Sequence, residues 1–117
     1  MYYSLIHMPR QNLGELEQLL LLALLRLDGH SYGAAIRAEI LDTTGRSITP
    51  GAIYPTLDRL EARGLLTSEM GEPSPQRGGR ARREFRITAA GIKEVRRSWQ
   101  QTAALASGIA ALGKTKG

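Results

Sequence analysis

Cysteine is absent from the 117-residue sequence, which excludes disulfide bonds, thiolate metal sites and a cysteine nucleophile. The two histidines, His7 and His30, have no partners at ligand spacing, so we expect no metal. The sequence contains no recognisable Ser/His/Asp set, carboxylate pair or phosphate-cradling glycine loop. These absences argue against an enzyme and against a cofactor.

Long apolar runs are also absent. The longest run covers residues 19–25, whereas a membrane-spanning helix needs roughly 20 apolar residues. The first ten residues lack the basic segment and apolar core of a secretory signal. Together with the missing thiols, which fit a reducing compartment, this predicts a cytoplasmic protein with no membrane partner.

Positive charge is in excess. The formal net charge is +5 and the sequence pI is about 10.1, in a chain short enough for one domain. Such a balance favours a polyanionic partner such as nucleic acid, although a charge of this size also serves solubility.

Residues 49–64 have the pattern of one short helix with a defined start and end. Thr49 is a candidate N-cap, Pro50 suits the first helical position, and Gly64 suits a left-handed C-terminal residue. Apolar side chains at helical spacing predict a core-facing stripe, formed by Ile53, Leu57 and Leu60.

The outer face of this helix is small at its N-terminal end and cationic at its C-terminal end. It comprises Gly51, Ala52, Pro55, Arg59 and Arg63. Small side chains permit close approach to another molecule, and arginines suit phosphates. An ordinary surface helix with two arginines is the alternative.

Two helices precede this segment. Residues 13–27, with Asn12 and Glu15 as a capping box, form a helix that is apolar nearly all round, which favours cover from a partner subunit. Residues 32–43 form the next helix, capped by Ser31. With the glycine-containing turn after it, this helix and residues 49–64 predict a helix-turn-helix.

The periodicity changes after Gly64 to alternation typical of two half-buried strands, at residues 66–70 and 84–87. The polar loop between them and the second strand are rich in arginine, which suits phosphates and narrow minor grooves. A solvated charge run is the alternative. The arginines are Arg77, Arg80, Arg82, Arg83 and Arg86.

Thr88 is expected to cap a last helix that extends to about residue 112 and carries a thin apolar seam for a neighbouring helix. We therefore predict a mainly α (α+β) winged helix-turn-helix with a two-stranded β wing and a C-terminal dimerisation helix. Residues 1–88 would form the DNA-binding domain, residues 89–113 the dimerisation helix of the same compact unit, and residues 114–117 a frayed tail.

The chain resembles the PadR family of bacterial transcriptional regulators. The matching strings are Gly14-Glu15-Leu16, Tyr32-Gly33 with Ile36, YPTLDRLEARGL at residues 54–65, and FRITAAG at residues 85–91. They occur in the family's order and cover roughly residues 13–99. The single C-terminal helix is similar to the smaller subgroup, whereas Phe85 stands where the family usually has tyrosine.

The resemblance implies a homodimer, joined through the first and last helices, that binds a palindromic operator as a repressor. For the major groove we predict Thr49, Gly51, Ala52, Tyr54, Pro55, Arg59 and Arg63, with the two arginines on phosphates. For the wing we predict Arg77, Arg80 and Arg82. Tyr54 could instead be a half-buried core residue.

A small planar effector is a further possibility that the resemblance raises. It would lie at an effector or dimer interface formed by Trp99, Val95, Leu16 and Leu20, although plain dimer packing of Trp99 is the interpretation we favour. A winged-helix module that binds a protein instead of an operator is the main alternative function.

Overall fold

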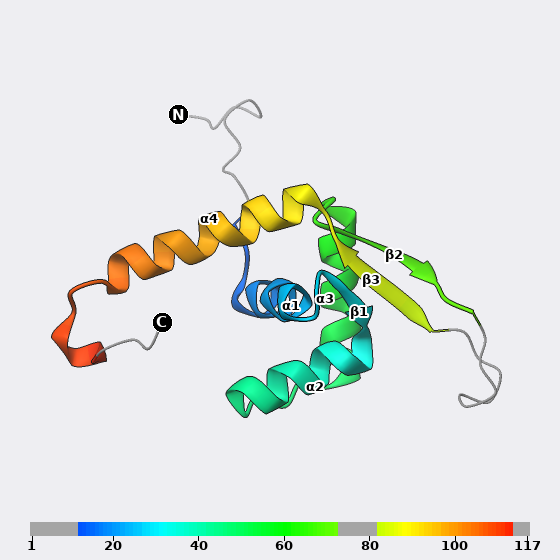
Figure 1. Cartoon of the computed structure of the whole chain (residues 1–117), viewed down its shortest axis with the longest axis horizontal. Helices are drawn as coiled ribbons and strands as arrows, with labels where there is room; N and C mark the ends of the chain where they lie inside the picture. Colours follow the sequence, from blue (N-terminus) through cyan, green and yellow to red (C-terminus); the bar gives the residue numbers. More distant parts are fainter. Residues whose placement is uncertain (1–11, 73–81, 114–117) are drawn as a thin grey trace, which may run out of the picture.

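The computed structural model describes residues 12–72 and 82–113, which form four α-helices, three β-strands and a final 3-10 turn (Figure 1). In chain order the elements are α1 (Glu15–Arg26), β1 (His30–Tyr32), α2 (Gly33–Thr44), α3 (Pro50–Ala62), β2 (Leu66–Met70), β3 (Arg83–Ile87), α4 (Ala89–Ala106) and η3 (Ala110–Leu112). Helices α2 and α3 form the helix-turn-helix, and strands β2 and β3 form the wing. The winged helix-turn-helix prediction is confirmed, while the expected frayed tail at residues 114–117 lies outside the described residues.

The antiparallel sheet has three strands, in the order β1-β3-β2, instead of the two predicted. Ser31 pairs with Phe85, and Ser68 pairs with Phe85 from the other side. Ser31 is therefore a strand residue, and its prediction as a helix cap was wrong; Tyr32 holds the N-cap position of α2, with extended backbone. Strand β1 is three residues long, which is too short to show an alternation of apolar and polar residues in the sequence. Its extended conformation depends on pairing with β3, which the sequence pattern does not reveal.

Helix α1 occupies the centre of the molecule. Figure 1 shows it nearly end-on, with α2 on one side, α4 on the opposite side, and α3 and the sheet on a third. Leu20, Leu21 and Leu24 are fully buried, and Leu25 stays 38% exposed. The chain itself thus covers most of the leucine surface for which the sequence had favoured a partner subunit.

The start of α1 differs from the capping box predicted at Asn12 and Glu15. Gly14 is the N-cap, and its backbone N–H donates to Glu17 Oε1 at 2.8 Å. Asn12 Oδ1 instead accepts from Arg97 of α4 at 3.1 Å. In a capping box, a carboxylate three residues after the N-cap accepts from the backbone N–H of the N-cap. Glu17 does this for Gly14, so the capping box lies two residues later than predicted.

Helix α3 matches its prediction closely. Thr49 caps it by accepting from the Ala52 N–H at 3.2 Å, and Pro50 is its first residue. Gly64 adopts a positive φ of 76° just after the helix, where side chains are disfavoured. The core stripe of Ile53, Leu57 and Leu60 is fully buried.

Helix α4 begins as expected, with Thr88 Oγ1 accepting from the Gly91 N–H at 3.0 Å. Its first half packs against α1, where Ser98 Oγ donates to Gln18 Oε1 at 2.7 Å. The second half projects away from the body of the molecule (Figure 1). The helix ends at Ala106 instead of continuing to residue 112, because Ser107 is extended and Gly108 has a φ of 79°.

Candidate nucleic-acid interface

The N-terminal half of α3 is exposed and carries no charge. Gly51, Ala52, Tyr54 and Pro55 lie at the surface with the capping Thr49, whereas Ile53 and Thr56 between them are buried. The first charged side chain of the helix is Asp58. Glycine, alanine and proline at this end leave the backbone open to close approach by another molecule, as the sequence predicted for a recognition helix.

Tyr54 is both packed and exposed. Its ring lies so close to Gly33 that a Cβ at that position would collide with it. Its ring centroid is 6.4 Å from that of Phe85, and the residue is 37% exposed. The ring packs α3 against the start of α2, which agrees with the half-buried alternative, and contact of Tyr54 with DNA stays a prediction.

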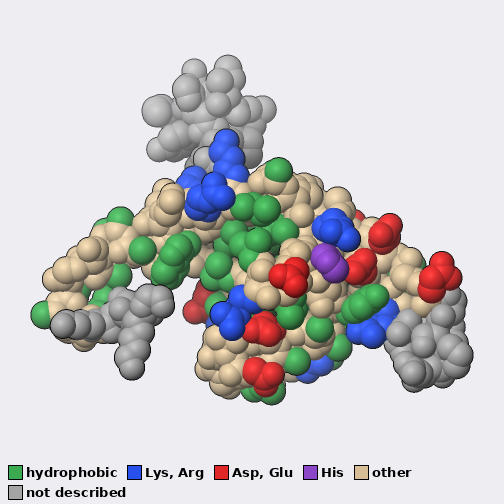
Figure 2. All heavy atoms as spheres, viewed as in Figure 1, with side chains coloured by type: hydrophobic (Ala, Val, Ile, Leu, Met, Phe, Trp, Pro, Cys, Tyr) green, Lys and Arg blue, Asp and Glu red, His purple; other side chains and the backbone are tan. Residues whose placement is uncertain are grey.

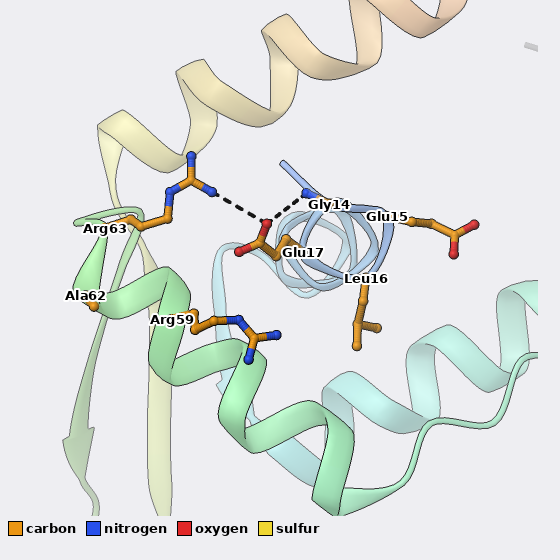
Figure 3. A pocket seen from close by; sticks show the side chains of 7 residues that line it. All are labelled: Gly14, Glu15, Leu16, Glu17, Arg59, Ala62 and Arg63. Carbon is orange, nitrogen blue, oxygen red and sulfur yellow. Dashed lines mark hydrogen bonds and ion pairs between the residues drawn. The ribbon is translucent and has the colours of Figure 1, made fainter. Parts of the chain in front are cut away.

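Arg59 points from the middle of α3 into a groove of about 560 Å³ between α3 and the start of α1 (Figure 3). Its Nη2 donates to Thr56 Oγ1 at 2.9 Å, and the residue is exposed. The groove is lined by Gly14, Glu15, Leu16, Glu17, Arg59, Ala62 and Arg63. The guanidinium remains accessible to an anion beside the exposed half of α3.

Arg63 is placed differently from its predicted position on the outer cationic face. Its side chain is only 20% exposed, with Nη1 3.5 Å from Glu17 Oε1 and Nη2 3.9 Å from Glu94 Oε2 (Figure 3). The guanidinium therefore lies among carboxylates of α1 and α4. A helical wheel of α3 alone could not find this arrangement, since both partners belong to other elements.

Glu94 is a nearly buried carboxylate, with its side chain 7% exposed. Arg97 one turn later donates to it at 2.8 and 3.2 Å, and these hydrogen bonds hold the pKa of Arg97 above its ordinary value. A buried charge is tolerated only when partners compensate it, so Glu94 with its arginines ties the end of α3 to α4. No sequence pattern identified this residue.

In the described part of the wing, Arg82 and Arg83 are held in contacts within the chain. The Arg82 guanidinium carbon lies 3.7 Å from the centroid of the Tyr32 ring, a cation–π contact at the loop end of the hairpin. Arg83 forms ion pairs with two carboxylates of α3. Arg86 is exposed on β3. Arg77 and Arg80, both predicted to contact DNA, lie outside the described residues.

The residues predicted for an effector or dimer interface divide into two groups. Leu20 and Val95 are 0% and 1% exposed within the single chain, so their assignment to an interface was wrong. Helices α1 and α4 of the same chain bury them together. Leu16 is partly buried at the groove, and Trp99 is 49% exposed.

An apolar surface continues beyond Trp99 along the projecting end of the chain. Leu105 is 81% exposed, Ile109 46% and Leu112 63%. Figure 2 shows hydrophobic side chains along this arm, away from the charged groups of the main body. Monomeric proteins rarely leave such residues together in water, which marks an interaction surface.

Within residues 12–72 and 82–113, no group of three or more His, Asp or Glu side chains is placed to hold a metal ion. Among these same residues, none of the helices combines the length and apolar character needed to cross a membrane.

Comparison with known proteins gives consistent matches. The model of the transcriptional regulator PadR-like family matches residues 21–97. Transcriptional regulator Rv3488 of Mycobacterium tuberculosis is 43% identical over 79 residues, which cover 65% of this chain and 69% of that regulator.

Solved structures agree with the family match. A PadR family transcriptional regulator from Eggerthella lenta superimposes with a TM-score of 0.66 at 32% identity, covering 87% of this chain and 88% of the other. F93 from STIV, a winged-helix DNA-binding protein, superimposes with a TM-score of 0.68, covering 84% and 98%. At 19% identity, the F93 likeness supports the fold alone.

Proposed function

Because this chain belongs to the PadR-like family of transcriptional regulators, we propose that it acts as a homodimeric repressor that reads a palindromic operator with α3. It is a DNA-binding winged-helix regulator and not an enzyme. Repression and the palindrome are part of the proposal, supported by the family resemblance and by the symmetry that a dimer imposes on its site.

The exposed and uncharged N-terminal half of α3 is the observation that carries the proposal. Gly51, Ala52 and Pro55 present a surface on which no side chain extends far beyond the backbone. A helix enters the major groove when its end can approach the base edges closely. Thr49, which is exposed, supplies a polar side chain at the start of this surface.

Basic residues around that surface would anchor the phosphates. Arg59 is exposed beside it, and Arg82 stands at the loop end of the wing strands. We extend the phosphate role to Arg77 and Arg80, which the sequence places in the wing loop. Arg63 is engaged with Glu17 and Glu94, so we now propose for it the role of holding α3 in place.

The homodimer would form through the projecting half of α4. Trp99 and Leu105 lie on α4 and Ile109 follows just after it, and all three are apolar and exposed. A second copy offers the same self-complementary surface, as a two-fold interface requires. Since Trp99 is half exposed there, a planar effector would stack on it; quenching of its fluorescence with the dimer retained would support an effector.

A titration of labelled duplex at several salt concentrations tests DNA binding. We expect Arg59→Ala to weaken binding about 10-fold and to make the salt dependence shallower by roughly one phosphate contact. The matched control is Arg96→Ala, which removes the same charge from an exposed position on α4. We expect the control to leave the affinity within about 2-fold.

Equal affinities for wild type and Arg59→Ala would reject the role of Arg59. A wild-type protein that binds no duplex in a salt-dependent manner would reject operator binding itself. This result would favour the alternative function, in which a winged-helix module binds a protein partner through the same surface.

A further inference from the structure

We propose that Arg83 of β3 is a positioning residue for DNA binding: it neutralises Asp58 on the surface of α3 and fixes the wing to that helix, without contacting DNA. The inference rests on the proposed function, because it concerns how the same interface is kept competent. The sequence had assigned Arg83 to the free positive charge of the wing.

Arg83 connects three elements through one guanidinium. Its Nη2 lies 2.8 Å from Asp58 Oδ1 and 2.8 Å from Glu61 Oε1, both on α3. Its Nε donates to Ser68 Oγ of β2 at 3.1 Å, and Ser68 Oγ in turn donates to Glu61 Oε1 at 2.8 Å. The guanidinium carbon also lies 4.8 Å from the centroid of the Phe85 ring. The loop end of the wing strands is thereby attached to one side of α3.

The two carboxylates explain why the attachment matters for a polyanionic partner. Asp58 follows Pro55 by one turn, and its side chain is 57% exposed. Without a cation beside it, this charge would face the phosphates that approach α3, and like charges brought together at an interface cost affinity. Arg83 is the cation whose guanidinium contacts both Asp58 and Glu61.

The Arg83 side chain stays protonated. Partial burial is the largest single influence and lowers its pKa, but the hydrogen bonds and charges of Asp58 and Glu61 together raise the pKa above the ordinary value. Arg83 therefore stays positively charged at neutral pH.

The orientation of the side chain separates this role from a phosphate contact. Nε and Nη2 are both committed to groups of the same chain, and the side chain is 34% exposed. The guanidinium of Arg82, one residue earlier, lies over Tyr32 instead. At the loop end of the wing strands, Arg82 thus packs on Tyr32 of β1 and Arg83 is bound to α3.

A charge-matched cycle tests the inference by duplex titration over a salt series, with wild type, Arg83→Ala, Asp58→Asn and the double variant. We expect Arg83→Ala to weaken binding about 10-fold with the slope of log affinity against log salt unchanged, because no phosphate contact is lost. Asp58→Asn in the Arg83→Ala background removes the exposed charge. It should recover at least half of the loss on a logarithmic scale.

The control is Asp42→Asn in the same Arg83→Ala background, which restores the same net charge at an exposed position on α2. We expect no recovery from it. Unfolding is followed for every variant; should Arg83→Ala fail to fold, Arg83→Gln replaces it throughout the cycle, since glutamine removes the same charge and keeps more of the side chain.

Wild-type binding together with a shallower salt slope for the Arg83 variant, or the absence of recovery by Asp58→Asn, would overturn the positioning role and leave the proposed function intact. Unchanged affinity of the Arg83 variant would do the same. A wild-type protein that does not bind duplex would overturn both proposals.

Discussion

Helices α3 and α4 each have one half that other elements of the chain contact (the held half) and one half that is exposed (the exposed half). The side chains of the two exposed halves differ in chemistry. In α3 the exposed half begins at Pro50 and is small and uncharged, and the held half ends in ion pairs through Arg63. In α4 the held half begins at the capping Thr88, and the exposed half carries Trp99 and continues to large aliphatic side chains.

This difference assigns the two surfaces to different partners. A small, uncharged surface flanked by arginines suits a groove of nucleic acid, where shape and nearby phosphates govern binding. A surface of tryptophan, leucine and isoleucine gains most by excluding water against a similar surface. We therefore expect changes in α3 to weaken DNA binding and leave the dimer intact, whereas changes in α4 should weaken the dimer and, through it, binding to a palindromic operator.

The largest effect is expected for charges placed on the exposed half of α4. Leu105→Asp near the end of α4, together with Ile109→Asp just beyond it, should remove the dimer. A two-fold interface would bury both side chains from each protomer, and four such side chains contribute roughly 6–12 kcal/mol at ~1.5–3 kcal/mol each. Sedimentation equilibrium would measure the change in dimer affinity, and circular dichroism should show that the helices remain.

The matched control for this pair is Gln100→Asp with Gln101→Asp, which adds the same charge at exposed polar positions of α4. A dimer that survives the Leu105 and Ile109 changes would place the interface elsewhere, and a monomeric wild type would remove the homodimer from the proposal.

The next largest effect is expected for Ala52→Glu in the exposed half of α3. Ala52 donates to the cap at Thr49, so a glutamate here would complete a capping box and leave stability unchanged or slightly higher. Its charge would oppose the DNA, and we expect binding to fall about 100-fold, or ~2.7 kcal/mol. Duplex titration with thermal unfolding separates the two quantities.

Ala62→Glu at the other end of the same helix is the control, since Ala62 is exposed at the end of α3 where the ion pairs lie. Equal losses for Ala52→Glu and Ala62→Glu would show that the two halves of α3 do not differ in the way proposed.

A smaller effect should distinguish the held half of α4 from its exposed half. Val95 is 1% exposed, so Val95→Ala should lower the free energy of unfolding by about 2 kcal/mol. Leu105→Ala should lower it by less than about 0.5 kcal/mol, because Leu105 is 81% exposed. Urea unfolding in an Ile109→Asp background, which keeps Leu105 and is first shown to be monomeric by sedimentation, isolates the chain; a reversed order would contradict the burial pattern.

The smallest effect concerns the start of α3. Thr49→Ala removes the acceptor for the Ala52 N–H and should cost about 1 kcal/mol of stability. Thr49→Ser, which keeps the hydroxyl, should restore most of it. If alanine and serine behave alike in thermal unfolding, the hydrogen bond does not stabilise the helix.

The sequence predicted α3 well because its signals are local. The cap at Thr49, the proline in the first turn, the apolar spacing and the positive φ at Gly64 all depend on neighbouring residues. The winged helix-turn-helix order followed from the same kinds of signal. The outer residues of the exposed half of α3 were named correctly as surface residues, and their contact with DNA stays a prediction.

Features set by distant partners were missed. Strand β1 exists through its pairing with β3, and the positions of Arg63 and Arg83 depend on carboxylates in other elements. Val95 and Leu20 were read as interface residues because a seam pattern does not tell which of its positions the chain itself will bury. Composition identified the arginines but not which of them were already engaged.

Selection of bound duplexes from a random pool by the wild-type protein tests operator reading through α3 most directly. We expect an enriched palindrome whose half-sites are separated by one helical turn of about 10–10.5 base pairs or a multiple of it, as a two-fold dimer requires. A pool that shows no enriched motif after repeated rounds, with binding retained at low salt only, would contradict sequence-specific recognition.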